Sequence, residues 1–250
     1  MASQLIHGDC LDKVKAIPAN SIGMVLTDLP YGTTAAKKWD TPIDLEEFWR
    51  EIRRVTVRGR AVALTSVQPF SATLVASNLK GFRHEWIWNK RTARGHLVAK
   101  KRPMQQHESV LIFSPNGEGV LYNPQMTKLD KPTKAGVERK RTDIMGGLGE
   151  STGYTTGEMR THTYPKTILE FGMDKRVGHS AQKPVALLEY MIKTYSNPGD
   201  TILDMTAGSG STAIAALNTG REYICIEKDQ EYFDLMKSRV DNHQQTLSVS

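Results

Sequence analysis

A carboxylate, a rigid turn and an aromatic ring stand together at residues 28–31, in the order Asp28, Leu29, Pro30 and Tyr31, just after the apolar run 22–26. Asp accepts hydrogen bonds, proline fixes the backbone so that neighbouring carbonyls can point one way, and Tyr offers a flat face for stacking. Such a turn could hold a planar base that carries an amine. The same residues also make an ordinary β-turn, so these four residues alone leave both interpretations open.

A second turn with chemical potential lies nearer the C-terminus, where Gly208 and Gly210 follow an apolar run that ends at Asp204. Its spacing matches the looser G-x-G-x-x-G/A form of the dinucleotide-binding fingerprint, and Glu227 ends the next apolar run, where an acid can bind a ribose diol. Asp204 would repel a pyrophosphate but would attract a cationic sulfonium that carries an ammonium group. The turn therefore favours S-adenosylmethionine over NAD.

Both turns follow predicted strands, and helices are predicted between the strands. Short apolar runs predict strands at 4–7, 22–27, 61–64, 86–88, 107–113, 201–204 and 223–227. Helical spacing and end signals predict helices between Cys10 and Pro18, from Asp44 to Gly59, over 68–79, from Lys183 to Asn197, after Gly210 and through Tyr232. Strands that alternate with helices indicate an α/β fold with a mainly parallel sheet and helices on both faces.

The helical and strand periodicity fails between Ser114 and Gly178, where Gly, Thr, Lys and Pro accumulate. We therefore expect a single catalytic domain over residues 1–242, with 115–178 as an inserted segment that is a candidate target-recognition region. Residues 243–250 are expected to form a flexible tail.

The composition is ordinary for a globular protein, and its basic balance is compatible with a polyanionic partner without requiring one. The chain has 250 residues, of which 39% are hydrophobic and 24% charged, enough for one sizeable core, and its formal net charge is +6. The two cysteines, Cys10 and Cys225, provide neither a disulfide framework nor a zinc-binding spacing. No apolar run approaches the length of a membrane span and no signal peptide is evident, so we expect a cytoplasmic protein that does not enter the membrane.

An ordered set of short motifs runs between Leu5 and Val240. In order they are Gly8-Asp9-Cys10, the turn 28–31, residues 51–55, Trp88-Asn89-Lys90, His107-Glu108, Gln182-Lys183-Pro184, and Leu203-Asp204 with Gly208-Ser209-Gly210. This set resembles the amino-methylating DNA methyltransferases of the β arrangement, in which the catalytic turn precedes the cofactor-binding turn. The resemblance implies a Rossmann-like S-adenosylmethionine-dependent methyltransferase sheet and a site-specific enzyme of the kind found in restriction-modification systems.

The resemblance also implies a set of cofactor-binding residues. Asp9 and the backbone of Cys10 would recognise the adenine of S-adenosylmethionine, and Glu227 would hold its ribose hydroxyls. Asp204, Gly208 and Gly210 would line the methionine portion, with Ser211, Thr212 and Lys183 near its carboxylate. Asp28 and Thr206 are further candidates for contact with the cofactor. Asp9 could instead simply cap the helix that follows it.

Two positions depart from the family pattern. Leu29 stands where the family usually has Pro, which matters little if only its backbone carbonyl is used. Thr206 stands where the family usually has Phe, and this change could loosen the packing around the cofactor. It also suggests an alternative function, a catalytically weak regulator that binds cofactor and DNA.

The chemistry of the first turn follows from the properties of an exocyclic amine, which is a poor nucleophile while it is conjugated to its ring. If Asp28 and the Leu29 carbonyl accept its two N–H groups, the lone pair is aimed at the methyl carbon and transfer proceeds in line, without a metal. The base must be flipped out of the duplex, with Tyr31 as one face of its pocket. In this family an Asp-led turn usually goes with adenine N6, so we expect an adenine methyltransferase, with cytosine N4 as the alternative.

Two basic stretches and one tryptophan are candidates for contact with double-stranded DNA. Trp39 lies in a polar loop that could fold over the catalytic turn. The first stretch, between two core strands, comprises Lys90, Arg91, Arg94, Lys100, Lys101 and Arg102; the second, in the insertion, comprises Lys128, Lys131, Lys134, Arg139, Lys140 and Arg141. Basic clusters are often only solvated surface, but loops around a base-flipping pocket favour phosphate contact. The sequence leaves open the recognition sequence and whether the chain forms a homodimer.

Overall fold

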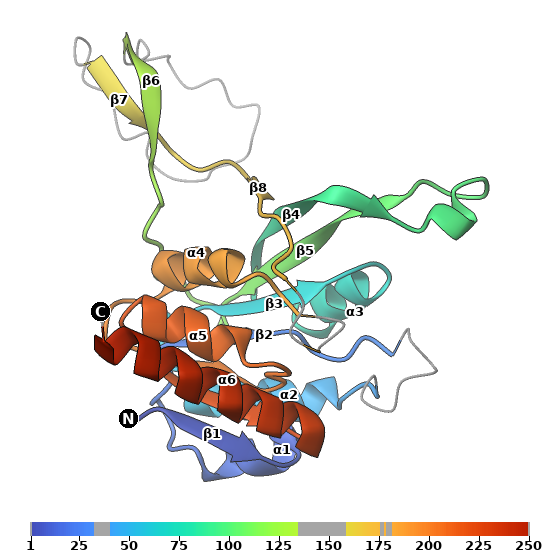
Figure 1. Cartoon of the computed structure of the whole chain (residues 1–250), viewed down its shortest axis with the longest axis vertical. Coiled ribbons are helices and arrows are strands. Elements are labelled where there is room, and N and C mark those ends of the chain that lie inside the picture. Colours follow the sequence, from blue (N-terminus) through green and yellow to red (C-terminus); the bar gives the residue numbers. More distant parts are fainter. Residues whose placement is uncertain (1, 33–40, 135–158, 176–177, 179–181, 250) are drawn as a thin grey trace. The chain divides into compact units, whose positions relative to one another are not determined.

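A twisted sheet with helices on both faces forms the larger part of the molecule (Figure 1). The computed structural model describes residues 2–32, 41–134, 159–175, 178 and 182–249. In spatial order the strands are β1 (Gln4–His7), β10 (Glu222–Glu227), β9 (Thr201–Asp204), β2 (Met24–Thr27), β3 (Val62–Ser66), β5 (Gln105–Phe113), β4 (Phe82–Arg94) and β8 (Ile168–Glu170).

The sheet is mainly parallel, as the sequence predicts. Strands β1, β10, β9, β2 and β3 all pair in parallel. Strand β5 is antiparallel to both β3 and β4, and β8 runs parallel to β4. Parallel neighbours need crossover connections, and the helices supply them.

Alternate residues of the central strands face opposite sides of the sheet, and three α-helices of the described part of the chain cover each side. Met24 and Leu26 belong to the core cluster that includes α4 (Val185–Tyr195), α5 (Ser211–Asn218) and α6 (Gln230–Val249). Val25 belongs to the cluster on the other side, which includes α1 (Cys10–Lys13), α2 (Leu45–Val55) and α3 (Phe70–Ser77). Strands buried on both faces read as continuous apolar runs, which is why the sequence identified them.

Local signals set the helix ends well. Asp44 caps α2, and its carboxylate accepts hydrogen bonds from the backbone N–H groups of Glu46 and Glu47 at 2.8 and 3.1 Å. Asp9 caps α1 in the same way and accepts from the Leu11 N–H at 3.0 Å. A short 3-10 helix over Val14–Ala16 follows α1 before Pro18.

The hairpin of β4 and β5 is longer than the sequence predicts. Apolar residues indicate a strand only at 86–88, whereas β4 continues to Arg94, which pairs with Gln105. Between these strands lies a 3-10 helix over His96–Val98, preceded by Gly95 with a φ of +96°. Backbone pairing with β5 extends the strand through polar residues that carry no hydrophobic signal.

The predicted insertion divides into two parts. Residues Pro124–Lys166 form a separate unit that contains the antiparallel pair β6 (Thr127–Lys134) and β7 (Met159–Thr163). Strand β8, which also falls within 115–178, instead joins the main sheet, and its Leu169 lies in the core. Among the described residues, no helix has the length and apolar character needed to cross a membrane.

Candidate active site

Three acidic residues meet where neighbouring parallel strands end. Asp28 follows β2, Asp204 ends β9 and Glu227 ends β10, and these strands are adjacent in the sheet. Ligands of open parallel sheets bind beyond the carboxyl ends of the strands. The two turns that the sequence singled out therefore lie on one edge.

A pocket of about 770 Å³ opens at this edge. Its volume lies in the range of sites for small molecules and cofactors. Residues with predicted roles that line it are Asp9, Cys10, Asp28, Leu29, Pro30, Tyr31, Lys90, Arg94, Lys183, Thr206, Gly208 and Glu227. A smaller cavity of about 40 Å³ is lined by Asp204, Ser211 and Thr212 together with Asp28, Lys183, Thr206 and Gly208.

Gly210 lines neither cavity. Its φ is +78°, and a Cβ at this position would lie 2.7 Å from the Cγ of Met236 on α6. The residue therefore allows the turn to form and α6 to pack closely against it. The expected contact of Gly210 with the methionine portion of a cofactor stays a prediction.

The Asp28 carboxylate is held by three donors from different parts of the chain. The Tyr31 hydroxyl donates to Oδ1 at 2.6 Å, and the Thr65 hydroxyl donates to the same oxygen. The Lys183 ammonium donates to Oδ2. Burial, together with the charges of Asp28 and Glu108, raises the pKa of Tyr31 well above its usual range, so its hydroxyl remains a donor.

Lys183 and Lys90 extend this contact into a row of alternating charges. Lys183 Nζ lies 3.7 Å from Oε2 of Glu108, and Lys90 forms an ion pair with Oε1 of the same carboxylate. Burial opposes the charge on Lys183, but the neighbouring carboxylates outweigh it and raise the pKa of that ammonium. The pocket wall therefore carries two carboxylates and two ammonium groups in close contact.

The structure gives these two lysines contacts that the sequence did not reveal. The ammonium of Lys183 binds carboxylates of the protein itself, and its expected place near a cofactor carboxylate stays a prediction. Lys90 was grouped with the cations that flank the loop between two strands, and it is only 7% exposed and lines the pocket. The alternation of Trp86, Trp88 and Lys90 along β4 places all three on the inward side, a signal present in the sequence.

Asp204 lies deeper, behind the glycine-rich turn. Its carboxylate accepts hydrogen bonds from the Thr212 hydroxyl at 2.5 Å and from the Thr206 N–H at 3.1 Å. Burial raises the pKa of Asp204 to about 6. No lysine or arginine within the described ranges forms an ion pair with it, so its charge is free to favour a cationic ligand.

Glu227 and Asp9 also line the larger pocket. The two oxygens of Glu227 accept from the N–H groups of Gly208, at 2.7 Å, and Asp229, at 2.8 Å. Asp9 caps α1 and also binds the Lys228 ammonium at 3.1 Å. Burial raises the pKa of the Cys10 thiol to about 11, which keeps it protonated.

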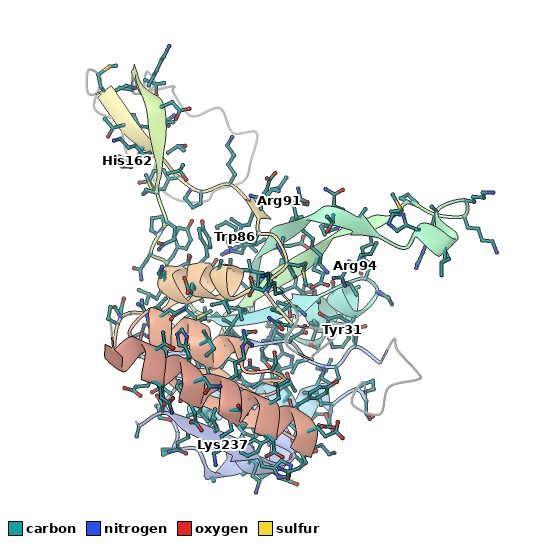
Figure 2. All side chains as sticks on the ribbon, in the orientation of Figure 1. Tyr31, Trp86, Arg91, Arg94, His162 and Lys237 are labelled. Carbon is teal, nitrogen blue, oxygen red and sulfur yellow. The ribbon has the colours of Figure 1, made fainter. Side chains whose placement is uncertain are left out.

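The predicted DNA-contacting residues fall into separate groups. Arg91, Arg94, Lys100, Lys101 and Arg102 are exposed on the β4–β5 hairpin, where Figure 2 labels Arg91 and Arg94. Lys128 and Lys131 are exposed on β6, to which Lys134 also belongs. Trp39, Arg139, Lys140 and Arg141 lie outside the described residues.

Sequence reasoning missed several side chains that complete the site. The Thr65 hydroxyl donates to Asp28. The sequence could have indicated this contact, because Thr65 directly follows the strand predicted at 61–64, which pairs with β2. Arg239 on α6 donates to Ser209 O and to Ser211 Oγ, both at 3.0 Å, and so supports the glycine-rich turn. No motif marks Arg239, because its contact depends on how α6 packs.

Known proteins share both the sequence pattern and the fold of this chain. A family model described as DNA methylase matches residues 22–238. The DNA adenine methyltransferase YhdJ of Escherichia coli (strain K12) is 29% identical over 251 residues, which cover 96% of this chain and 83% of that protein.

Two solved structures show the same fold. The crystal structure of the M1.HpyAVI–SAM complex aligns with a TM-score of 0.61 at 20% identity, over 94% of this chain and 98% of that chain. The PvuII DNA methyltransferase, described as cytosine-N4-specific, aligns with a TM-score of 0.64 at 14% identity, over 97% and 91%. The expected α/β methyltransferase sheet is thereby confirmed.

Proposed function

This chain belongs to the DNA methylase family, and we propose that it methylates the N6 amine of adenine in double-stranded DNA. Its coarser activity, amino-methylation of DNA with S-adenosylmethionine, follows from the family. The observation that carries the finer proposal is the Asp28 carboxylate, which stands at the end of β2 in the pocket. The Asp-led turn and the relationship to an adenine methyltransferase both favour adenine.

The residues at the ends of β9 and β10 suit S-adenosylmethionine. Asp204 is a buried carboxylate with a raised pKa, and a cationic ligand beside it would offset the cost of its burial. Glu227 retains acceptor capacity for ribose hydroxyls, because a carboxylate has about four acceptor sites and two backbone N–H groups occupy only part of them. The bound cofactor supplies an electrophilic methyl group.

Asp28 and the main-chain carbonyl of Leu29 accept the two N–H groups of the target amine. Because both oxygens of Asp28 already accept from protein donors, one of those donors must give way to the amine. Lys183 is suited to do so, since Oε2 of Glu108 lies 3.7 Å away and has no other hydrogen-bond partner among the described residues. The ammonium can move to Glu108 and leave Asp28 Oδ2 to the base.

The reaction is a direct displacement in which the amine nitrogen gains a bond to the methyl carbon and the sulfonium–carbon bond breaks. The methylated amine carries an extra proton, which Asp28 accepts and passes to water. Orientation of the lone pair and stabilisation of the developing charge are the contributions of Asp28 and the Leu29 carbonyl. No covalent enzyme intermediate is formed.

Tyr31 forms one face of the pocket for the flipped base. Its ring lies 5.3 Å from the ring of Phe70, and its hydroxyl is tied to Asp28, so the side chain is held in place before the base arrives. Tyr31 and Arg94, both labelled in Figure 2, line the same pocket. A base extruded from the duplex would enter beside a cation that can contact the adjoining phosphate.

The β4–β5 hairpin carries cations suited to the DNA backbone. From Asn89 to His107 the chain has six lysines and arginines and no carboxylate, and all of these cations except Lys90 are exposed. We assign phosphate contact to this hairpin. The separate unit of β6 and β7 is the candidate for sequence recognition, because a two-stranded ribbon with exposed Lys128, Lys131 and His162 has dimensions that fit a major groove.

The test is to incubate the purified protein with S-adenosylmethionine and unmethylated genomic DNA and to analyse the digested nucleosides by mass spectrometry. N6-methyladenine is expected, and Asp28→Ala serves as the inactive control. N4-methylcytosine would overturn the choice of base while keeping the mechanism. Cofactor and DNA binding without any methylated product would favour the regulator instead.

A further inference from the structure

A short chain of hydrogen bonds joins the turn after β9 to the turn after β2. The Met205 N–H donates to Thr27 Oγ1 at 3.2 Å. The hydroxyls of Thr27 and Thr206 lie 2.8 Å apart, and the Thr206 hydroxyl donates to the main-chain carbonyl of Asp28 at 2.9 Å. The cofactor turn and the catalytic turn are therefore connected through two threonine side chains.

The direction of these bonds is set by the number of hydroxyl protons. A threonine hydroxyl has a single proton to donate. Thr206 gives its proton to the Asp28 carbonyl, so the bond between the two hydroxyls must be donated by Thr27. Thr27 in turn accepts from Met205, and its hydroxyl also interacts with the Asp204 carboxylate, which opposes the rise in the pKa of that group.

Thr206 also contacts the carboxylate on the cofactor side. Its N–H donates to Oδ1 of Asp204 at 3.1 Å, and Oδ2 of that carboxylate accepts from Thr212 at 2.5 Å. Thr206 lines both the large pocket and the smaller cavity. It is thus bonded to the end of β9 through its backbone and to the catalytic turn through its side chain.

We propose that Thr206 is a positioning residue for methyl transfer, which holds the Asp28–Leu29 peptide in a set orientation relative to the cofactor turn. The proposal rests on the function proposed above. The Asp28 carbonyl belongs to the peptide that links Asp28 to Leu29, so the bond from Thr206 fixes the backbone angle ψ of Asp28 and with it the position of the Leu29 carbonyl relative to the Asp28 carboxylate. Because in-line transfer is sensitive to misplacement of about 1 Å, the hydroxyl acts on the chemical step.

This role differs from the expectation that threonine at position 206 loosens the packing around the cofactor. A valine has nearly the same shape but no proton to donate, so Thr206→Val removes the bond to Asp28 and keeps the packing. Thr206→Ser keeps the proton. Comparing the two separates the hydrogen bond from the volume of the side chain.

The experiment measures the single-turnover rate of methyl transfer at saturating cofactor and DNA, together with the dissociation constant of S-adenosylmethionine by calorimetry. We expect Thr206→Val to lower the rate about tenfold or more while the dissociation constant changes less than about twofold. Thr206→Ser should recover most of the loss. Thr27→Val should have a smaller effect, and combining it with Thr206→Val should add little, because both residues act through one chain.

Thr56→Val is the matched control. Thr56 is fully buried on the connection after α2, and its hydroxyl has no hydrogen-bond partner among the described residues, so its removal should leave the rate unchanged. A normal rate in Thr206→Val, equal losses in the valine and serine variants, or weaker cofactor binding with a normal saturated rate would each overturn the positioning role. A wild-type protein that transfers no methyl group would instead overturn the proposed function, and this role with it.

Discussion

Removing the Asp28 side chain should lower the rate of methyl transfer by about 10² or more and leave cofactor binding intact. In Asp28→Ala the target amine loses its charged acceptor, and the Lys183 ammonium loses one of its two carboxylate partners. Loss of one positioned transition-state partner typically lowers the rate by about 10²–10³, which corresponds to about 2.7–4 kcal/mol. We expect a loss at least at the lower end of this range.

The same change has a limited cost in stability. Breaking a fully buried ion pair costs about 3–5 kcal/mol, because a charge is left without compensation. Here the Asp28 side chain is 24% exposed and Lys183 keeps Glu108 within 3.7 Å. A loss of about 1–3 kcal/mol is therefore expected, in line with the loss of hydrogen bonds to charged groups.

The assay compares wild type, Asp28→Ala and Asp28→Asn in single-turnover methyl transfer, calorimetric titration with S-adenosylmethionine and thermal melting. Asn keeps acceptor capacity toward Tyr31 and Thr65 but presents no charge to Lys183, so it should be inactive while remaining closer in stability to wild type. Full activity in Asp28→Ala would show that the turn has only a structural role. A large loss of cofactor affinity would move Asp28 from the base to the cofactor.

Further predictions concern the cofactor carboxylate, the hairpin and the base-stacking ring. Because burial raises the pKa of Asp204 to about 6, cofactor affinity should fall as the pH drops below about 6 and the carboxylate takes up a proton, and calorimetry of Asp204→Asn should show no such dependence. In the free protein the protonated carboxyl is favoured by folding, so its contribution to the free energy of unfolding is fully present below the ordinary pKa of 3.8 and is lost as the pH rises through about 6. The melting temperature of wild type should therefore fall relative to that of Asp204→Asn over this pH range. A constant difference between the two melting temperatures would contradict the shift. Replacing the three cations at 100–102 by alanine should make DNA affinity depend less on salt. The slope of log affinity against log salt concentration should fall by about 0.9 for each phosphate that the variant no longer neutralises. An unchanged slope would show that these cations do not contact the DNA. Tyr31→Ala should weaken capture of the flipped base by about 1–3 kcal/mol in a binding assay with a mismatched target, and Tyr31→Phe should be mild, whereas equal losses would show that the hydroxyl matters more than the ring.

Local signals in the sequence account for much of the fold. The strand at Gln4–His7 and the cap at Asp44 are found where they were predicted, since apolar runs and capping residues act on their immediate neighbours. The extension of β4 to Arg94 and the pairing of β8 with β4 were not predicted. Both depend on backbone hydrogen bonds to a strand that is distant in the sequence. Such bonds can form with almost any side chain, so they leave little trace in the amino-acid sequence.

The sequence by itself determined the order of the motifs, and from that order the family, the cofactor and the placing of Asp28, Asp204 and Glu227 at strand ends. Only the tertiary structure decided which side chains meet there. Lys183 reaches Asp28 across 155 positions of the chain, and Thr206 reaches the Asp28 carbonyl across 178. Periodicity describes which way a residue faces within its own element, but the contacts between two turns depend on strand order and register, which arise only when the whole sheet is assembled.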